Sequence, residues 1–159
     1  MGASWGAVID YLVTGLAAPL AAAQADAEPF DNVPREAGST AVVIGREAPD
    51  SGGAGSGTMA YAELGAGRIQ ENYTVPGYIQ CWRPGPDQKP ARDAAISLLD
   101  AVITFVHADP TLGGLLQRGR IGIVGQVAFR QTQDEQDLAG GALYAGIDFE
   151  LQVQNTYIP

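Results

Sequence analysis

The residues that could do chemistry are few. The 159-residue chain has one histidine, His107, and one cysteine, Cys81. His107 is followed at once by Asp109, Pro110 and a pair of glycines. A histidine near a carboxylate is a typical start for a general-base or nucleophile-activating site. The same residue types also end a helix, so the spacing around them has to decide which reading applies.

That spacing indicates a helix and its stop signal within the stretch from Ala91 to Leu116. Pro90 suits a first helical turn, and the residue before Pro110 is pushed out of helical geometry, which ends the helix. His107 is then expected on the wet side of the last turn, where the helix dipole favours an imidazole. Apolar residues fill the buried faces, and one polar stripe recurs at intervals of three and four: Asp93, Ser97, Asp100, Thr104 and His107.

Other motifs that could carry chemistry fail on context. The G-x-S-x-G match at residues 2–6 has no strand before its serine, which a nucleophile elbow needs. The glycine-rich stretch 52–58 has no lysine and is not a phosphate loop. An acidic run lacks the spacing of a calcium loop and is typical of a solvated loop: Asp134, Glu135 and Asp137. We therefore expect no catalytic residue, no metal and no cofactor.

Composition limits the classes of partner. The length predicts one domain over residues 1–159, and a hydrophobic content of 46% is typical of a globular fold. The net charge of −9 argues against a protein that grips nucleic acid by its phosphates. A single cysteine cannot form an internal disulfide.

The apolar N-terminal segment predicts an amphipathic helix from about Trp5 to Ala18, capped by Ser4, with Pro19 kinking it or starting a second short turn. A signal peptide is the alternative, but no lysine or arginine precedes Arg35, and Asp10 interrupts the apolar run. We expect no membrane span, since the segment is short and is broken by charge and proline.

Alternating residues predict several strands. Short strands are expected at 41–44 and 58–64, a longer one at 68–82 interrupted by Pro76-Gly77, and another at 121–131. The last strand alternates most clearly, with Ile147, Phe149, Leu151 and Val153 on one face. Proline inside a strand implies an edge or a bulge. The predicted class is α+β: a mainly antiparallel sheet, or a mixed one, with a long helix and the N-terminal helix on one face.

Four segments resemble, in their residue pattern and in their order along the chain, the tail terminator (tail completion) proteins of long-tailed phages of the lambda type. The likeness is strongest to forms from actinobacterial phages and prophages. The segments cover most of the chain: PFDNVP with AVVIG, RIQENYTVPGYIQCW, ARDAAISLLDAVITFVHADPTLGG, and the strand pair that ends in FELQVQ. The likeness lies in pattern and not in catalytic residues. The glycine-rich loop of about 46–57 departs from it by its length.

The resemblance implies a virion protein of the tail or neck, made in the host cytoplasm. It would form a homo-oligomeric ring, with a hexamer expected, that stops tail-tube polymerisation and meets the head connector. Its expected partners are itself, the tail tube protein, the connector or stopper protein, and as a further candidate the tape measure protein. Double-stranded DNA would pass through the ring without specific binding.

Candidate contact residues follow from the ring. A closed ring needs one patch of a subunit to meet a different patch of its neighbour. The Pro76-Gly77 strand is one candidate interface, with Tyr73, Pro76, Gly77 and Tyr78. The acidic run Asp134, Glu135 and Asp137 is a candidate for the lumen or a tube contact, because acidic side chains repel DNA phosphates. The alternatives are a head-closure, neck or tail-tube protein, and less favoured, a small ligand-binding domain or enzyme.

Overall fold

A computed structural model describes residues 5–31, 39–46, 57–63, 67–131 and 142–157, and the fold is α+β. Two helices and six strands follow one another along the chain. Their bounds are α1 Trp5–Ala23, β1 Glu28–Phe30, β2 Ala41–Ile44, β3 Gly57–Glu63, β4 Arg68–Pro84, α2 Lys89–Ala108, β5 Arg120–Gln131 and β6 Ala142–Tyr157. The predicted class is confirmed.

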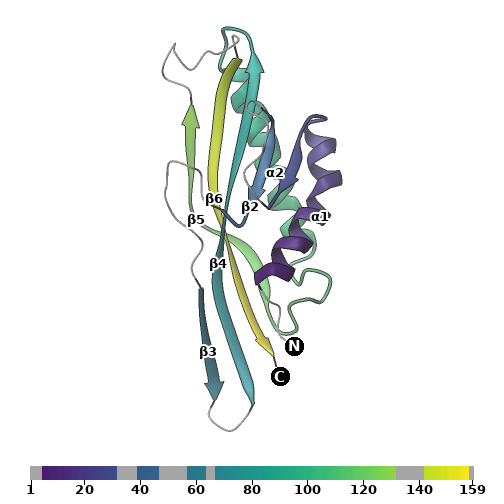
Figure 1. Cartoon of the computed structure of the whole chain (residues 1–159), viewed down its shortest axis with the longest axis vertical. Helices are drawn as coiled ribbons and strands as arrows, with labels where there is room; N and C mark the ends of the chain where they lie inside the picture. The colour runs from purple at the N-terminus through teal and green to yellow at the C-terminus, as the bar shows by residue number, and fades with distance from the viewer. Residues whose placement is uncertain (1–4, 32–38, 47–56, 64–66, 132–141, 158–159) are drawn as a thin grey trace.

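The strands form one mixed sheet in the order β1-β2-β4-β6-β5, with β3 also paired to β4. The β1–β2 pair is parallel, and the other strand pairs among the described residues are antiparallel. The long strands β4 and β6 run side by side from Ile69↔Tyr157 to Pro84↔Ala142. Both helices lie on one face of the sheet (Figure 1), as the sequence predicts for an apolar sheet face that needs cover.

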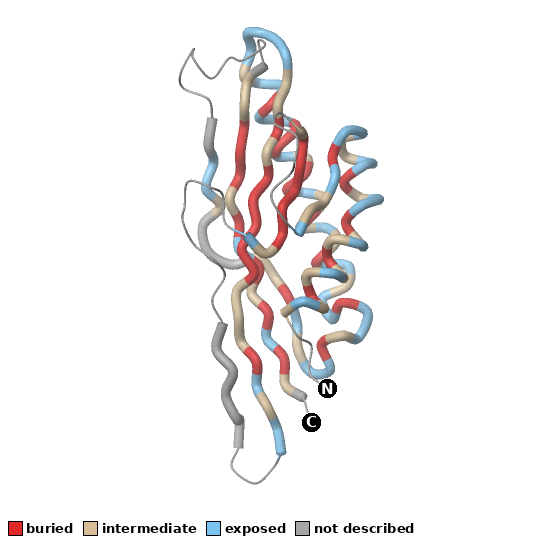
Figure 2. The backbone as a smooth tube through the Cα atoms, in the orientation of Figure 1, coloured by how far each residue is buried: buried red, intermediate tan, exposed pale blue. Residues whose placement is uncertain are grey.

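The core lies between the helices and the sheet (Figure 2). Helix α1 contributes a stripe at intervals of four, Val8, Leu12, Leu16 and Leu20, all fully buried. It is long and apolar enough to cross a membrane by length and composition. The helix continues past Pro19, so the expected end at Ala18 is wrong: Leu20 prolongs the buried stripe and its carbonyl accepts the Gln24 N–H at 2.8 Å.

Helix α2 matches its predicted polar stripe and its predicted ends. Pro90 stands in the first turn and Asp109 is the C-cap. The stripe residues Asp93, Asp100, Thr104 and His107 are exposed. Ile96 is also 37% exposed, so the solvent face of the helix is wider than the polar stripe alone indicates.

Strand β4 is continuous through Pro76-Gly77, and the predicted break there is wrong. The strand lies in the middle of the sheet, but its second neighbour changes along its length: β2 pairs up to Gly77, and β3 starts at Tyr73. The Pro76 carbonyl accepts the Gly45 N–H at 2.7 Å, so Pro76 faces the side where β2 ends. Because N–H and C=O of one strand residue point to the same side, the missing N–H of proline falls in the gap between β2 and β3.

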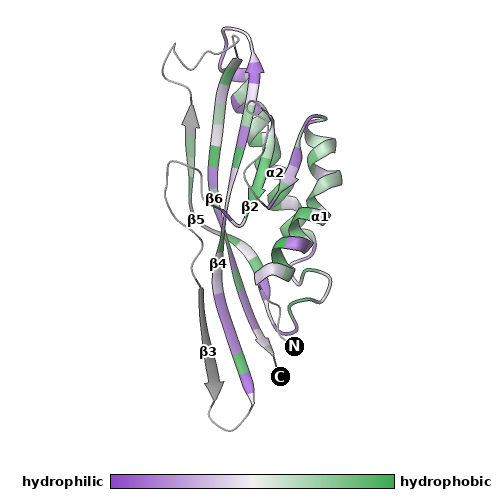
Figure 3. Cartoon of the chain, in the orientation of Figure 1, coloured by the Kyte–Doolittle hydropathy of each residue, from purple (hydrophilic) through white to green (hydrophobic). Residues whose placement is uncertain are grey.

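At one end of the sheet, β3 and the adjoining ends of β4 and β6, toward Arg68 and Tyr157, extend away from the helices (Figure 1), and we call this the distal end. The distal part of β4 is largely hydrophilic in Figure 3. Buried residues are sparser there than in the helix-covered part (Figure 2).

Candidate functional site

The stretch around His107 is a structural helix end. His107 is exposed on the last turn of α2. Asp109, the neighbouring carboxylate, is occupied: it accepts hydrogen bonds from the Tyr11 hydroxyl at 2.7 Å, the Gly113 N–H at 2.5 Å and the Thr111 hydroxyl at 3.0 Å. The Tyr11 hydrogen bond lowers the pKa of Asp109 most strongly. This carboxylate fastens the turn after α2 to α1.

Replacing Asp109 with alanine should lower Tm by a few degrees at neutral pH, because three donors lose their acceptor at once. The pKa of Asp109 is below its ordinary 3.8, so its contribution is present above that value and is lost as pH falls through the lowered pKa. Melting curves of the variant and the wild type should converge in acid. Asp100→Ala, on the exposed stripe of the same helix, should change Tm little. Equal shifts for the two variants would contradict this role.

The other reactive candidate, Cys81, is buried. Burial raises the pKa of its thiol to about 12, so it stays protonated and behaves as a small core side chain. Nearby, the Arg83 guanidinium donates to both carboxylate oxygens of Asp26 at 2.9 and 3.0 Å, and to Thr40 and Gln24 at 2.9 and 2.8 Å. Burial acts to raise the pKa of Asp26, but hydrogen bonds from Thr40 and Arg83 hold it below its usual value. These contacts join the end of α1 to β2 and β4.

The four residues proposed for an interface strand lie on β4. Pro76, Gly77 and Tyr78 are buried, and Tyr78 packs with Val43 and Phe30 in a small cluster apart from the main core. A methyl group at Gly77 would lie 2.6 Å from the Phe149 ring and 2.9 Å from the Val43 carbonyl oxygen. Tyr73 is half-buried and contacts the Trp5 ring, with centroids 5.5 Å apart. Their burial has an intramolecular explanation, whatever a second subunit adds.

The remaining predicted contact residues lie outside the described part of the chain. These are the acidic residues Asp134, Glu135 and Asp137 and nearly all of the glycine-rich loop of 46–57. Within the described ranges, no group of three or more His, Cys, Asp and Glu residues has the geometry to hold a metal ion.

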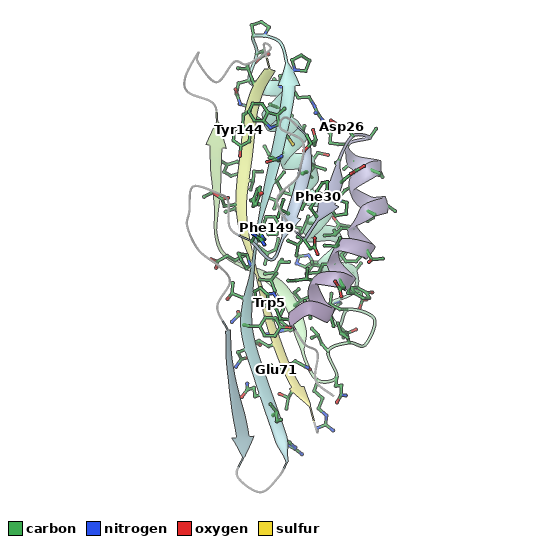
Figure 4. The ribbon with its side chains drawn as sticks, in the orientation of Figure 1. Trp5, Asp26, Phe30, Glu71, Tyr144 and Phe149 are labelled. Carbon is green, nitrogen blue, oxygen red and sulfur yellow. The ribbon has the colours of Figure 1, made fainter. Side chains whose placement is uncertain are left out.

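The distal end holds a cluster of buried polar residues that the sequence analysis missed, among them Glu71 (labelled in Figure 4). Glu71 is 6% exposed and Asn155 1% exposed, and their Cα atoms are paired across β4 and β6. Three buried atoms have no hydrogen-bond partner among the described residues: Glu71 Oε2, Asn155 Nδ2 and the Tyr73 hydroxyl. Such atoms are rare in folded proteins and costly to bury, so the cluster needs an explanation.

Burial sets the protonation of this cluster. It raises the pKa of Glu71, and the nearby Asn155 amide lowers it by less. Burial and the charge of Glu71 together raise the pKa of Tyr73 to about 12. A signal was present in the sequence: Glu71 shares a strand face with Ile69, Tyr73 and Val75, and Asn155 continues the apolar series that ends at Val153. A charged or amide side chain at a core position in an alternating strand marks such a cluster.

Next to Asn155, the start of β5 and the end of β6 enclose a surface hollow of about 420 Å³. Arg118, Arg120, Gln70, Gln154, Asn155 and Thr156 line it. Gly119 shapes one wall, because a Cβ there would lie 1.9 Å from the Gln154 carbonyl oxygen, so only glycine allows the two backbones to approach this closely. The Arg118 N–H points at the Asn155 Oδ1 across 3.4 Å.

Comparison with known proteins points to one shared fold. No protein-family model matches the chain, and no curated protein sequence matches it. Among solved structures, it is similar to a chain of the "virion of native gene transfer agent (GTA) particle", with a TM-score of 0.53 and 20% sequence identity. The likeness covers 96% of this chain and 100% of that chain. At this identity the comparison shows the fold.

Proposed function

We propose that this chain is a structural protein of a virion, and more specifically a tail terminator: a ring that ends the tail tube and meets the head connector. The observation that carries the proposal is the likeness of the whole fold to a chain of a gene transfer agent virion, over 96% of this chain and 100% of that one. The resemblance of four sequence segments to tail terminators of long-tailed phages supports the narrower role.

The physical properties of the chain agree with a ring subunit. A ring contact is heterologous and needs two unlike surfaces. Among the described strands, β5 pairs only with β6 at one edge of the sheet, and β1 and β3 lie at the other edge. A subunit with a net charge of −9 can provide a bore that repels DNA phosphates and lets DNA pass. The partners proposed are further copies of the chain, the tail tube protein and the connector, with the tape measure protein as a further candidate.

The decisive experiment is electron microscopy of lysates from the parent phage with this gene stopped by a nonsense codon. Tails of irregular length beside filled, tailless heads are expected for a terminator. Detached tails of normal length would replace the terminator role by a neck or head-closure role, and absence of any tube would indicate a tube subunit. Normal virions would overturn the structural role altogether.

We also propose that Asp134, Glu135 and Asp137 face the lumen or a tube contact. Reversing all three to lysine should reduce infectivity by about tenfold or more, since a basic bore would hold the phosphates it must release. The matched control is Asp10, Glu28 and Asp100 changed together to lysine, which makes the same charge change at residues of α1, β1 and α2. Unchanged assembly and infectivity in the loop variant would refute this placement.

An enzyme is the competing class, and His107 tests it most simply. His107→Ala should alter folding stability by no more than about 0.5 kcal/mol, because the side chain is exposed on a helix end. Virion assembly should also be unaffected. Loss of infectivity with normal particle morphology would instead indicate a chemical role for the only histidine.

A further inference from the structure

The charged residues that line the hollow beside β5 are all basic. These are Arg118 and Arg120, both exposed arginines. Neither forms an ion pair with a carboxylate in the described part of the chain, where the ion pairs are Arg83–Asp26, Lys89–Asp93 and Arg92–Asp93. An arginine guanidinium offers a planar fork of N–H groups that fits a carboxylate or a phosphate. The hollow therefore suits an anion.

Polar residues of β4 and β6 also line the hollow. Asn155 is one of them, but along β6 its side chain points to the opposite face from Gln154 and lies beside Glu71, whose pKa it lowers. Gln70, Gln154 and Thr156 add further donors to the wall.

Charge complementarity favours a protein carboxylate over a DNA phosphate as the anion that binds in the hollow. The chain has 18 acidic and 9 basic residues, so the surface of a second copy is rich in carboxylates. A cationic hollow is an exception on such a chain, and a head-to-tail contact needs two unlike patches. DNA phosphate is chemically similar, but a chain of net charge −9 repels a duplex over the rest of its surface.

We propose that the hollow formed by Arg118, Arg120, Gln154 and Asn155 is a docking socket for an acidic side chain of a second copy of this chain. The proposal rests on the proposed ring and assigns one of its contacts. In the assembled ring, the incoming carboxylate accepts hydrogen bonds from the exposed Arg118 and Arg120 guanidinium groups.

The test is sedimentation analysis of the purified full chain over a range of protein and NaCl concentrations. Wild type should self-associate, and salt should weaken the association, as expected for a charge contact. The double variant R118E/R120E should self-associate at least 10-fold more weakly, and so should Q154E, which places a carboxylate of its own in the hollow. Arg92→Glu is the matched control, since Arg92 is exposed in the first turn of α2 and away from the hollow. Circular dichroism confirms that each variant is folded.

Several outcomes overturn the socket. Self-association equal to wild type in both hollow variants would do so, as would a wild type that stays monomeric at low salt. A fluorescence assay with a short DNA duplex separates the sources of anion: loss of DNA binding in R118E/R120E with unchanged self-association would assign the hollow to phosphate. The nonsense mutant tests the proposed function independently of the socket. Irregular tails in the nonsense mutant but normal virions with R118E/R120E would reject the socket and keep the terminator.

Discussion

Replacing Gly77 with alanine is expected to destabilise the protein by about 1–3 kcal/mol, the usual cost of overpacking a core. The added Cβ would lie 2.6 Å from Cζ of Phe149 and 2.9 Å from the Val43 carbonyl oxygen. Phe149 is 2% exposed and has little room to move, and the carbonyl is fixed by the β2–β4 ladder. Urea unfolding of the purified protein measures the loss.

A matched control for this variant is Gly122→Ala. Gly122 also lies in a strand, but a Cβ there meets no atom within 4 Å, so its stability should change little or rise. The comparison also separates two roles of the Pro76-Gly77 segment. A loss of unfolding free energy that does not depend on protein concentration would show that the effect of Gly77 is intramolecular. A variant with unchanged unfolding free energy and weaker self-association would assign Gly77 to the subunit contact alone and contradict the packing argument.

Replacing Glu71 with glutamine is expected to stabilise the protein by about 1–3 kcal/mol at pH values above its pKa, because a buried carboxylate whose Oε2 has no hydrogen-bond partner among the described residues is removed. Burial raises the pKa of Glu71 above its ordinary 4.5. The neutral acid is therefore favoured in the fold, and that advantage is present below 4.5 and is lost as pH rises through the raised pKa. The gain from the variant should accordingly appear as pH rises and vanish in acid.

Urea unfolding at about pH 8 and about pH 4 tests this pH dependence, since these values bracket the titration of a buried carboxyl. Glu150→Gln removes an exposed carboxylate of β6 and should change stability by less than about 0.5 kcal/mol at either pH. A destabilised Glu71→Gln protein at the higher pH would mean that the carboxylate has a partner in the folded chain. It would then argue that the cluster is satisfied and needs no ligand.

The distal end and the helix-covered core differ in how well their buried polar atoms are hydrogen-bonded. The core packs apolar side chains of α1 and α2 against the sheet, and the buried Thr40 at its margin is hydrogen-bonded to Asp26 and Arg83. The distal end instead buries Glu71 and Asn155 with atoms that have no partner among the described residues. Native interiors rarely leave such atoms unbonded, which is why the distal end is the place where we expect assembly to complete the structure.

The sequence predicted a large part of the fold because helix and strand periods are local properties. The four-residue spacing from Val8 to Leu16 identified the buried stripe of α1, and the alternation from Ile147 to Val153 identified β6. Pro90 and Asp109-Pro110 marked the ends of α2. The same local logic failed at Pro19 and Pro76, where a proline rule predicted an end or a break. In α1, burial of Leu20 favours continuation of the helix past Pro19. In β4, Pro76 lies where neither β2 nor β3 pairs with the strand, so its missing N–H costs no hydrogen bond.

The candidate site was less predictable. The structure places His107 on an exposed helix end and buries the Cys81 thiol. The sequence analysis did not identify the residues that line the hollow. Arg118 lies in the connection before β5 and Arg120 is the first residue of β5, and neither belongs to a motif. The pairing of Asn155 with Glu71 appears only in the structure.

The helices, most of the strands, their apolar faces and the acidic character of the chain could all be predicted before the structure was known. Those follow from residue type and near-neighbour spacing, which the backbone geometry converts directly into faces. Only the tertiary structure decided the strand order β1-β2-β4-β6-β5, the pairing of Glu71 with Asn155, and the hollow between β5 and β6. These depend on which distant strands pair and in which register, and a shift of one residue would turn every side chain of a strand to the other face.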